Sequence, residues 1–506
     1  MRTVSTVRTI SLLVIVMLLA TLLAACSGAA TPTKAPEPTK PPEPTAVPVE
    51  LMKVSAADCA YGGAFKSIEA VDANTVKFTL CAPDVAFPSK VAFSAFAIHS
   101  SDYLEKTGGT GDLLDKPVGT GPYMLDKWQK GDSVIMKANP NYWGDKAQSP
   151  TLVFRWQKEA AARLLELQSG TTDGIDNPGP DDFKVIEGDS ALKLYPREAL
   201  NVFYLGFSNL VKPFDNEMVR QAVAMGIDRQ RIVDNFYPVG SVVASHFTPC
   251  AIPGGCDGEE WYKFDAAAAK KMLADAGFPN GFETELSFRD VVRGYLPQPA
   301  LVAQDLQAQL KANLGVTVKI NVMESGAFLD TAKTGTLPMY LLGWGADFPD
   351  ATNFLDQHFG AGSSPQFGDH FDDLTALLTQ AASLSSEAER APLYAQANDL
   401  IREYVPMIPV AHGGNGAAFL ATVQNAHVSP LSTEIFAKMD SGKDTFVWMQ
   451  NAEPISLFCA DETDGETFRA CGQITESLLA YGQDSGETVP ALAKKLNQFA
   501  SSPPPR

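Results

Sequence analysis

The clearest hydrophobic pattern of the chain predicts a helix followed directly by a strand. Apolar side chains recur at every fourth position: Val302, Leu306, Leu310 and Leu314. This spacing forms one apolar face of a helix, and Gly315 is the residue type that commonly ends one. The next apolar residues alternate with polar ones: Val316, Val318, Ile320 and Val322. A period of two predicts a strand with one buried face.

Further apolar stretches flank this helix and strand. An extended stretch covers residues 283–288, a short helix is predicted at 328–332, and the apolar run Met339 to Trp344 follows. Strands that alternate with helices typically form parallel sheets with helices on their faces. The predicted fold class is therefore α/β.

Two more helices are predicted outside this region. Asp215 is a favourable N-cap residue, and an apolar periodicity runs from it toward Asp228. Residues 386–401 form another amphipathic pattern, which Pro392 is expected to interrupt. Prolines and glycines around His412 mark a break at which the chain could pass between two lobes.

The N-terminus has the pattern of an export signal. Basic residues without an acid precede an apolar run that ends at Leu23, and the run is short for a membrane-spanning helix. The residues LAAC, ending at Cys26, resemble a bacterial lipobox, in which the cysteine becomes the N-terminus and carries a lipid. We expect a lipoprotein signal peptide over 1–25 and lipidation of Cys26. A plain secretory signal followed by a stray cysteine is the alternative.

Residues 26–50 contain the lipidated cysteine and a proline-rich linker. Proline alternates there with Thr, Ala, Lys and Glu, a composition typical of an extended spacer that builds no core. A spacer after a lipid anchor would hold a folded body away from the membrane. The expected location is extracytoplasmic, on the cell membrane.

The cysteines agree with export. The sequence has seven cysteines, and six are left when Cys26 is set aside. These form three sequence-local pairs as disulfide candidates: Cys59 with Cys81, Cys250 with Cys256, and Cys459 with Cys471. An oxidising compartment permits all three bonds, although sequence does not determine connectivity. Zinc is the rival interpretation, but no spacing is C-x-x-C and the histidines are dispersed, so neither metal nor cofactor is expected.

The net charge and the absence of two catalytic motifs limit the classes of function that are expected. Forty basic residues against 59 acidic ones give a net charge of -19, which repels phosphate backbones, so nucleic acid is not an expected partner. Neither G-x-S-x-G nor H-E-x-x-H occurs. A secreted hydrolase would need paired acids, such as Asp181 with Asp182 or Asp347 with Asp350. Acids this close in sequence seldom flank one bond across a cleft, so an enzyme is not expected.

Several motifs point together to one family. The segments are Phe207-Ser208-Asn209, Pro213-Phe214-Asp215, Val219-Arg220-Gln221-Ala222, Ile227-Asp228-Arg229, Pro117 to Tyr123, Asn139 to Gly144, and Gly343 to Asp347. They resemble family 5 of the extracytoplasmic solute-binding proteins of ABC importers, which takes peptides, nickel and some oligosaccharides. The resemblance covers most of Phe65 to Gln498. It implies a two-lobe periplasmic-binding-protein-like fold with mixed or parallel sheets and a hinge.

The order of the segments departs from that family. Residues 445–492 look like the stretch that normally opens the mature protein, which implies a circular permutation. The expected domains are lobe I over 51–202 plus 411–506 and lobe II over 203–410. Members usually continue after the "PALA" stretch with an aromatic hairpin and a helix, and this chain has no match to them. Lobe I is therefore expected to be incomplete.

The resemblance implies a ligand site between the lobes, with Asp347 as the first candidate. The matching aspartate of peptide-binding members pairs with the ligand's α-ammonium, and ligands of α/β sheets sit beyond the carboxyl ends of strands. Trp344 would shield this carboxylate, and Gly343 and Gly345 would let the backbone approach the ligand. The alternative is that Asp347 only caps a turn.

Other candidates surround this residue. Arg289 and Arg293 could bind a ligand carboxylate, although a surface salt bridge is equally compatible with their positions. Tyr295 could line a side-chain pocket with Trp344, or simply pack in the core. The segment that matches the family's backbone contacts from the other lobe is Thr463-Asp464-Gly465.

The resemblance implies a lipid-anchored, monomeric receptor that binds a peptide-like solute between two lobes and delivers it to an ABC import permease. A nickel-chelate or oligosaccharide binder of the same family is the nearest alternative. A truncated receptor without function is another.

Overall fold

The computed structural model describes residues 52–384 and 386–497, so the predicted signal peptide, Cys26 and the proline-rich linker lie outside the described residues. The chain divides into two compact units between Thr79 and Leu80. In the first unit, β1 (Lys53–Ser55), β2 (Phe65–Asp72) and β3 (Thr75–Leu80) form a small sheet in that order, with β1 antiparallel to β2. Within the described ranges, no helix combines the length and apolar character needed to cross a membrane.

The second unit contains a mixed six-stranded sheet. Its order is β10-β14-β9-β13-β11-β12. The strands are β9 (Asn201–Phe207), β10 (Val242–Val243), β11 (Glu283–Arg289), β12 (Thr317–Met323), β13 (Met339–Gly345) and β14 (Met407–His412). β11 runs parallel to both β12 and β13, as the alternating strands and helices predict. β9 is antiparallel to β13 and β14, so the sheet is mixed.

The helices of this part follow the predicted periodicities with two corrections. They are α7 (Glu217–Gly226), α8 (Arg229–Phe236), α9 (Ala266–Asp275), α10 (Pro299–Leu314), α11 (Ser325–Ala332), α12 (Leu355–Phe359), α13 (Asp372–Ala382), α14 (Glu387–Tyr404) and the short η2 (Ala351–Asn353). Asn216, not Asp215, caps α7, because its side chain accepts from the Met218 amide. Pro392 does not interrupt α14, where buried Tyr394 and Ile401 hold the helix against the core.

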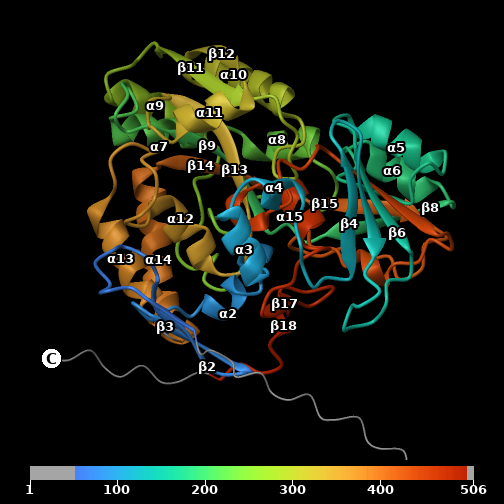
Figure 1. Cartoon of the computed structure of the whole chain (residues 1–506). Coiled ribbons are helices and arrows are strands. Elements are labelled where there is room, and N and C mark those ends of the chain that lie inside the picture. Colours follow the sequence, from blue (N-terminus) through green and yellow to red (C-terminus); the bar gives the residue numbers. More distant parts are fainter. Residues whose placement is uncertain (1–51, 385, 498–506) are drawn as a thin grey trace, which may run out of the picture. The chain divides into compact units, whose positions relative to one another are not determined.

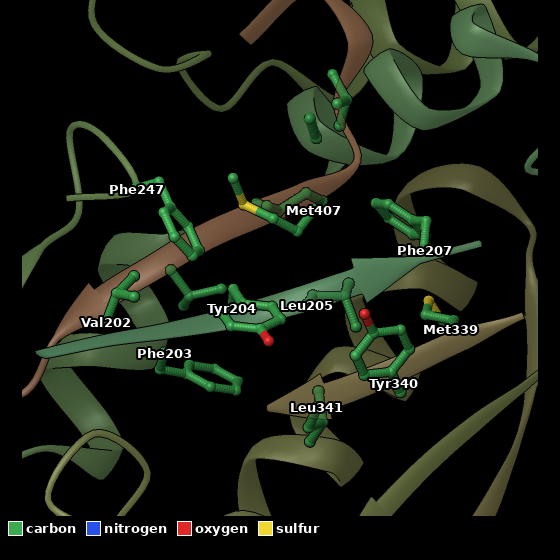
Figure 2. Packing of buried hydrophobic residues seen from close by; sticks show 14 of the residues in the cluster. Val202, Phe203, Tyr204, Leu205, Phe207, Phe247, Met339, Tyr340, Leu341 and Met407 are labelled. Atoms are coloured by element: carbon green, nitrogen blue, oxygen red, sulfur yellow. The ribbon is translucent and has the colours of Figure 1, made fainter. Parts of the chain in front are cut away.

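The core of this part is centred on β9. Every residue of β9 is buried, which requires cover on both faces of the strand. Figure 2 shows Tyr204 and Leu205 between side chains of β13 and β14, with Phe247 packed nearby. This buried strand pairs with the neighbouring β13, at whose carboxyl end the candidate site begins.

The second unit also contains a seven-stranded sheet (Figure 1). Its buried side chains form a hydrophobic cluster separate from that of β9. Its order is β4-β5-β6-β16-β7-β15-β8. The strands are β4 (Tyr123–Gln129), β5 (Ser133–Ala138), β6 (Thr151–Trp156), β7 (Gly174–Asp176), β8 (Leu192–Arg197), β15 (Asn415–Leu420) and β16 (Thr445–Gln450). β16 is the last of these strands in sequence, yet it lies in the middle and runs parallel to β6 and β7.

The rest of the second unit consists of short elements and the connections between them. They are α2 (Phe87–Lys90), η1 (Ser94–Phe96), α3 (Ser101–Thr107), α4 (Asp112–Asp115), α5 (Ala160–Gln168), α6 (Asp182–Gly188), η3 (Phe436–Lys438), η4 (Cys459–Asp461), α15 (Gly465–Cys471), β17 (Leu479–Tyr481) and β18 (Thr488–Pro490). β17 and β18 pair as an antiparallel ribbon.

The chain crosses between the two large sheets after β8 and again after β14. Asn201 joins the crossings, because its Nδ2 donates to the Gly413 carbonyl (2.8 Å) and its Oδ1 accepts from the Gly413 amide (2.9 Å). Arg197 adds a hydrogen bond to Asn415 Oδ1 (2.9 Å). The two connections are therefore held together side by side.

Candidate ligand-binding site

Asp347 lies in the loop that follows the carboxyl end of β13. The loop begins after Gly345, and the carboxylate is half-buried. Because β13 is parallel to β11, the loops after both strands leave the same edge of the six-stranded sheet. Ligand sites of α/β sheets occur at such edges.

Asn353 fixes Asp347 in place. The Asp347 amide donates to Asn353 Oδ1 (2.9 Å), and Asn353 Nδ2 donates to Asp347 Oδ2 (3.2 Å). The same Asn353 oxygen accepts from Trp344 Nε1 (3.2 Å). Asn353 is only 4% exposed. One buried amide thus orients both the acid and the indole, a role that our sequence analysis missed.

Asp350, not Asp347, caps the turn in this loop. Asp350 Oδ1 accepts from the Thr352 amide (2.9 Å), and both Asp350 carboxylate oxygens accept from the Arg390 guanidinium (2.8 and 2.7 Å). This pairing lowers the pKa of Asp350 against the opposing effect of burial. An acid engaged in this way is poorly suited to pair with Asp347 in hydrolysis.

The environment of Asp347 raises its pKa to about 6. Burial is the main cause, since it penalises the charged form, and the hydrogen bond from Asn353 offsets part of the effect. Among the described residues, no lysine, arginine or histidine forms an ion pair with this carboxylate. A cation placed beside it would recover the lost solvation.

The two glycines before Asp347 differ in their surroundings. A Cβ on Gly343 would lie 2.3 Å from Tyr295 Cδ2 and 2.5 Å from the Val202 carbonyl oxygen, so glycine is needed there for packing. A Cβ on Gly345 would meet nothing within 4 Å. Of the two, Gly345 has the open space that a ligand would need.

The loop after β11 carries both candidate arginines and Tyr295. Arg289 Nη1 donates to Ser325 Oγ (3.0 Å), and its Nη2 donates to Tyr295 Oη (3.4 Å). Arg293 Nη1 lies 3.5 Å from Glu466 Oε1. The structure therefore gives these two arginines different partners, which the sequence alone could not distinguish.

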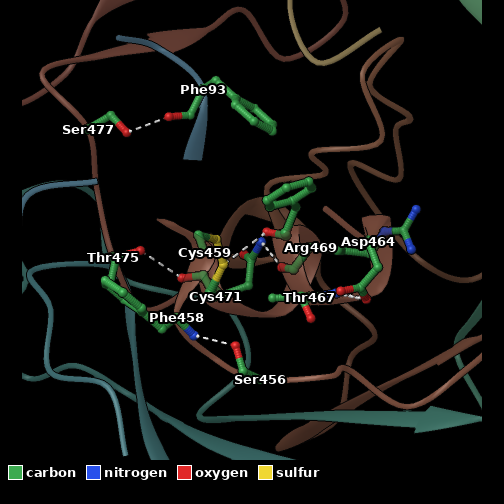
Figure 3. Close-up of a disulfide and its surroundings, with 12 residues drawn as sticks. Phe93, Ser456, Phe458, Cys459, Asp464, Thr467, Arg469, Cys471, Thr475 and Ser477 are labelled. Atoms are coloured by element: carbon green, nitrogen blue, oxygen red, sulfur yellow. Dashed lines mark hydrogen bonds between the residues drawn. A yellow bond between two sulfur atoms is a disulfide. The ribbon is translucent and has the colours of Figure 1, made fainter. Parts of the chain in front are cut away.

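Asp464 lies just before α15, on the part of the chain that follows β16. Figure 3 shows its carboxylate accepting from the Thr467 amide (2.9 Å), which caps the helix. The other carboxylate oxygen is buried without a hydrogen-bond partner. Burial and the nearby Glu466 raise the pKa of Asp464 to about 6. Thr463 and Gly465 beside it are exposed.

A disulfide encloses this segment. Cys459 and Cys471 are bonded to each other, so residues 463–465 lie inside a covalent loop (Figure 3). A second disulfide joins Cys250 to Cys256. The remaining described cysteines, Cys59 and Cys81, are also disulfide-bonded. Within the described ranges, the side chains form no group able to hold a metal ion.

Several contacts join the loops of the six-stranded sheet to the other part of this unit. Arg293 reaches Glu466 on α15, and Lys158 Nζ lies 3.7 Å from Asp290 Oδ2. Tyr481 of β17 donates from its hydroxyl to the Asp347 carbonyl (3.3 Å). The segments 289–295 and 463–466 thus lie on loops that these contacts connect, and the backbone of Asp347 is bonded to β17.

Comparison with known proteins places these features in a family. The model of the bacterial extracellular solute-binding proteins, family 5, middle part, matches residues 36–366. Heme-binding protein A of Haemophilus influenzae is 32% identical over 377 residues, which are 73% of this chain and 69% of that protein. The dipeptide-binding protein of Escherichia coli is 31% identical over 376 residues, 73% of this chain and 70% of its own.

Solved structures agree with these matches. A periplasmic binding protein of Helicobacter pylori in complex with the peptide STSA has a TM-score of 0.67 and 29% identity, covering 74% of each chain. A dipeptide-binding protein of Pseudoalteromonas in complex with Met-Leu has a TM-score of 0.70 and 25% identity, covering 75% of this chain and 76% of the other. The chain has the α/β fold of periplasmic binding proteins, as predicted, and it belongs to family 5 of the bacterial extracellular solute-binding proteins.

Proposed function

We propose that this chain is a lipid-anchored extracytoplasmic receptor that binds a short peptide or peptide-like solute between two lobes and delivers it to an ABC import permease. Membership of a family of binding proteins supports reversible binding without a reaction. Relatives named as dipeptide-binding or di/tripeptide-binding proteins support a peptide as the solute.

The observation that carries this proposal is the half-buried Asp347, which is oriented by Asn353 and has a raised pKa. The α-ammonium of a peptide is a compact cation with hydrogen-bond donors, so it would complement this carboxylate. Charge-assisted bonds are roughly twice as strong as neutral ones, and they strengthen further where water is excluded. Asp347 would therefore select a free N-terminus.

Closure of the two lobes would couple binding to delivery. A ligand shifts an open–closed equilibrium only through a better affinity for the closed state. Contacts such as Arg293 with Glu466 and Tyr481 with the Asp347 carbonyl supply interactions that would exist only with the lobes together. The proposed lobes are 203–410 and, around the seven-stranded sheet, 51–202 with 411–506.

The proposed circular permutation has support from the position of β16. This strand comes from the segment 445–492 that resembles the opening of other members, and it is central rather than added at an edge. Trp448 and Phe446 are fully buried in its core. A strand so placed belongs to the basic architecture of the sheet. The proposed lipid anchor at Cys26 is supported by the LAAC sequence alone.

Calorimetry with chemically blocked peptides tests the proposed function. We expect the dipeptide Ala-Leu or tri-alanine to bind the wild-type protein, and N-acetylation of the same peptide to weaken that binding at least tenfold. Asp347→Asn should lower the affinity for the free peptide at least tenfold and should change the affinity for the acetylated peptide little. Asp181→Asn, at an exposed acid, serves as the matched control. Binding of a nickel–histidine complex or maltotriose, with no response to any peptide, would contradict the proposal.

A further inference from the structure

Four buried charged side chains form a closed ring that joins the seven-stranded sheet to α15. Asp176 ends β7, Arg197 ends β8, Glu434 lies just before η3, and Arg469 lies on α15. Arg197 Nη2 contacts Asp176 Oδ1 (3.2 Å) and Glu434 Oε1 (2.6 Å). Arg469 contacts Asp176 Oδ2 through Nη2 (3.0 Å) and Glu434 Oε2 through Nε (2.9 Å). Each acid thus bridges both arginines, and each of the four side chains is at most 3% exposed.

Stability alone does not account for this charge ring. Burial opposes the charge on Glu434, and the two arginines outweigh that effect and keep its pKa well below the ordinary value. Replacing a buried ion pair by apolar side chains of similar volume commonly leaves a protein equally stable or makes it more stable. The directions of the four contacts, in contrast, permit only one arrangement of the segments that carry the charges.

One side of the charge ring reaches both crossings between the large sheets. Arg197 is the last residue before the first crossing, because it ends β8. Asn415 is the first strand residue after the second crossing, and it pairs with Arg197 in the antiparallel ladder of β8 and β15. Arg197 Nη1 also donates to Asn415 Oδ1 (2.9 Å). The charge ring is therefore tied to the two connections that any movement of the sheets must bend.

The other side of the charge ring holds α15. Arg469 lies within this helix (Figure 3), and Gln473, which follows the helix, donates from Nε2 to the Glu434 carbonyl (3.0 Å). Glu466 lies three positions before Arg469, so the two share one face of the helix. Glu466 in turn contacts Arg293, in the loop after β11 (3.5 Å). The charge ring thus determines where α15 meets the loops of the six-stranded sheet.

We propose that the charge ring positions α15 relative to the two crossings, so that the helix meets the loops after β11 and β13 in the arrangement that holds a peptide. Asp176, Arg197, Glu434 and Arg469 are then positioning residues, which act through the helix and touch no ligand. This inference rests on the proposed function and deepens it, because it names buried residues outside the site that set the affinity of the site.

Exchange of one ion pair of the ring for apolar side chains separates positioning from stability. The variant Glu434→Leu with Arg469→Met keeps the net charge of the ring at zero and leaves Asp176 paired with Arg197. We expect it to melt cooperatively near the wild-type temperature, because apolar replacements of this kind are tolerated. Its affinity for Ala-Leu, measured by calorimetry at about pH 8, should fall at least fivefold. Hydrogen exchange of the α15 amides should become faster in the ligand-free variant.

Two further variants complete the test. Arg155→Met with Glu166→Leu is the matched control, because this half-buried pair (3.4 Å) joins β6 to α5 and has no contact with α15. It should change neither the affinity nor the exchange of α15. Arg469→Lys keeps a cation in the ring with fewer donors, so its affinity should lie between those of the wild type and the paired variant.

A paired variant that melts cooperatively and binds Ala-Leu as tightly as the wild type would overturn the inference. If the paired variant does not fold, Arg469→Lys decides instead: wild-type affinity together with wild-type exchange of α15 would overturn it as well. A wild-type protein that binds no free peptide would contradict the proposed function itself, whereas the results above presuppose a wild type that binds.

Discussion

At the residue scale, the site depends on a single buried amide. Asn353 bonds the backbone and carboxylate of Asp347 and also the Trp344 indole. Without it, the loop after β13 would lose the bonds that define the direction of the acid. A buried group left without its partner costs about 1–3 kcal/mol.

We therefore predict that Asn353→Ala weakens peptide binding at least tenfold and lowers the free energy of unfolding by about 1–3 kcal/mol. Isothermal calorimetry and urea denaturation measure the two effects. Asn313→Ala is a matched control, because Asn313 Nδ2 bonds the Gly226 carbonyl (2.8 Å) in α7, away from the site. It should lower stability without changing affinity. Full affinity in Asn353→Ala would show that Asp347 is oriented by other contacts.

The raised pKa of Asp347 predicts how affinity depends on pH. Only the ionised carboxylate attracts an ammonium group, and its pKa in the free protein is about 6. Affinity for a free peptide should therefore be maximal above about pH 7 and should fall as the pH decreases through 6. Calorimetry from pH 5 to 8 measures this change. Asp347→Asn should remove most of it, and an unchanged slope in that variant would assign the titration to another group.

The raised pKa of Asp347 has the opposite effect on the stability of the ligand-free protein: a lower pH, which weakens peptide binding, favours the folded state. The pKa is raised from the ordinary aspartate value of 3.8, so the folded protein binds more protons than the unfolded chain between about pH 4 and 6. Protonation of Asp347 should thus stabilise the fold as the pH falls through this range. Buried His358 and His412, with their pKa values lowered to about 4, act in the opposite direction. The difference in melting temperature between wild type and Asp347→Asn isolates the aspartate.

At the element scale, α15 and its disulfide present the second part of the site. The bond between Cys459 and Cys471 spans 12 positions and encloses residues 463–465. Both cysteines are buried and pack with Phe468. Closing the loop lowers the entropy of the unfolded chain and holds the helix start in one conformation.

Replacing both Cys459 and Cys471 by alanine should lower the free energy of unfolding by about 3 kcal/mol and weaken peptide binding severalfold. The matched control is the double alanine variant of Cys250 and Cys256, whose separation is 6. It should cost about 2 kcal/mol and leave affinity unchanged, because neither cysteine takes part in the hydrogen bonds and ion pairs described for the site. Equal affinities in the two variants would show that the first disulfide does not organise the site.

The helices and strands also differ in how well the sequence predicts them. The strands and helix at 283–323 could be predicted because the periods of 3.6 and 2 depend on local burial. The cap of α7 was misplaced by one residue, since Asp215 and Asn216 are both good caps. Asn353 was missed because its role appears only when η2 folds back toward Asp347. Tyr481 lies 134 positions away, beyond any local pattern.

At the scale of the whole molecule, the proposed function requires two lobes that close on a solute. The two crossings between the sheets are joined through Asn201 and Gly413, while the ion pair of Arg293 with Glu466 lies elsewhere along the junction. A small-angle scattering measurement should show a smaller radius of gyration with saturating peptide. Arg293→Gln should reduce that change, and an unchanged radius in the wild type at saturation would contradict closure.

The most direct test of the central claim is a crystal structure of the protein with a bound dipeptide. We expect the ligand's ammonium nitrogen to lie about 3 Å from an Asp347 carboxylate oxygen, between the two large sheets. A peptide bound at another place, or an Asp347 carboxylate turned into bulk solvent beside the bound peptide, would contradict it.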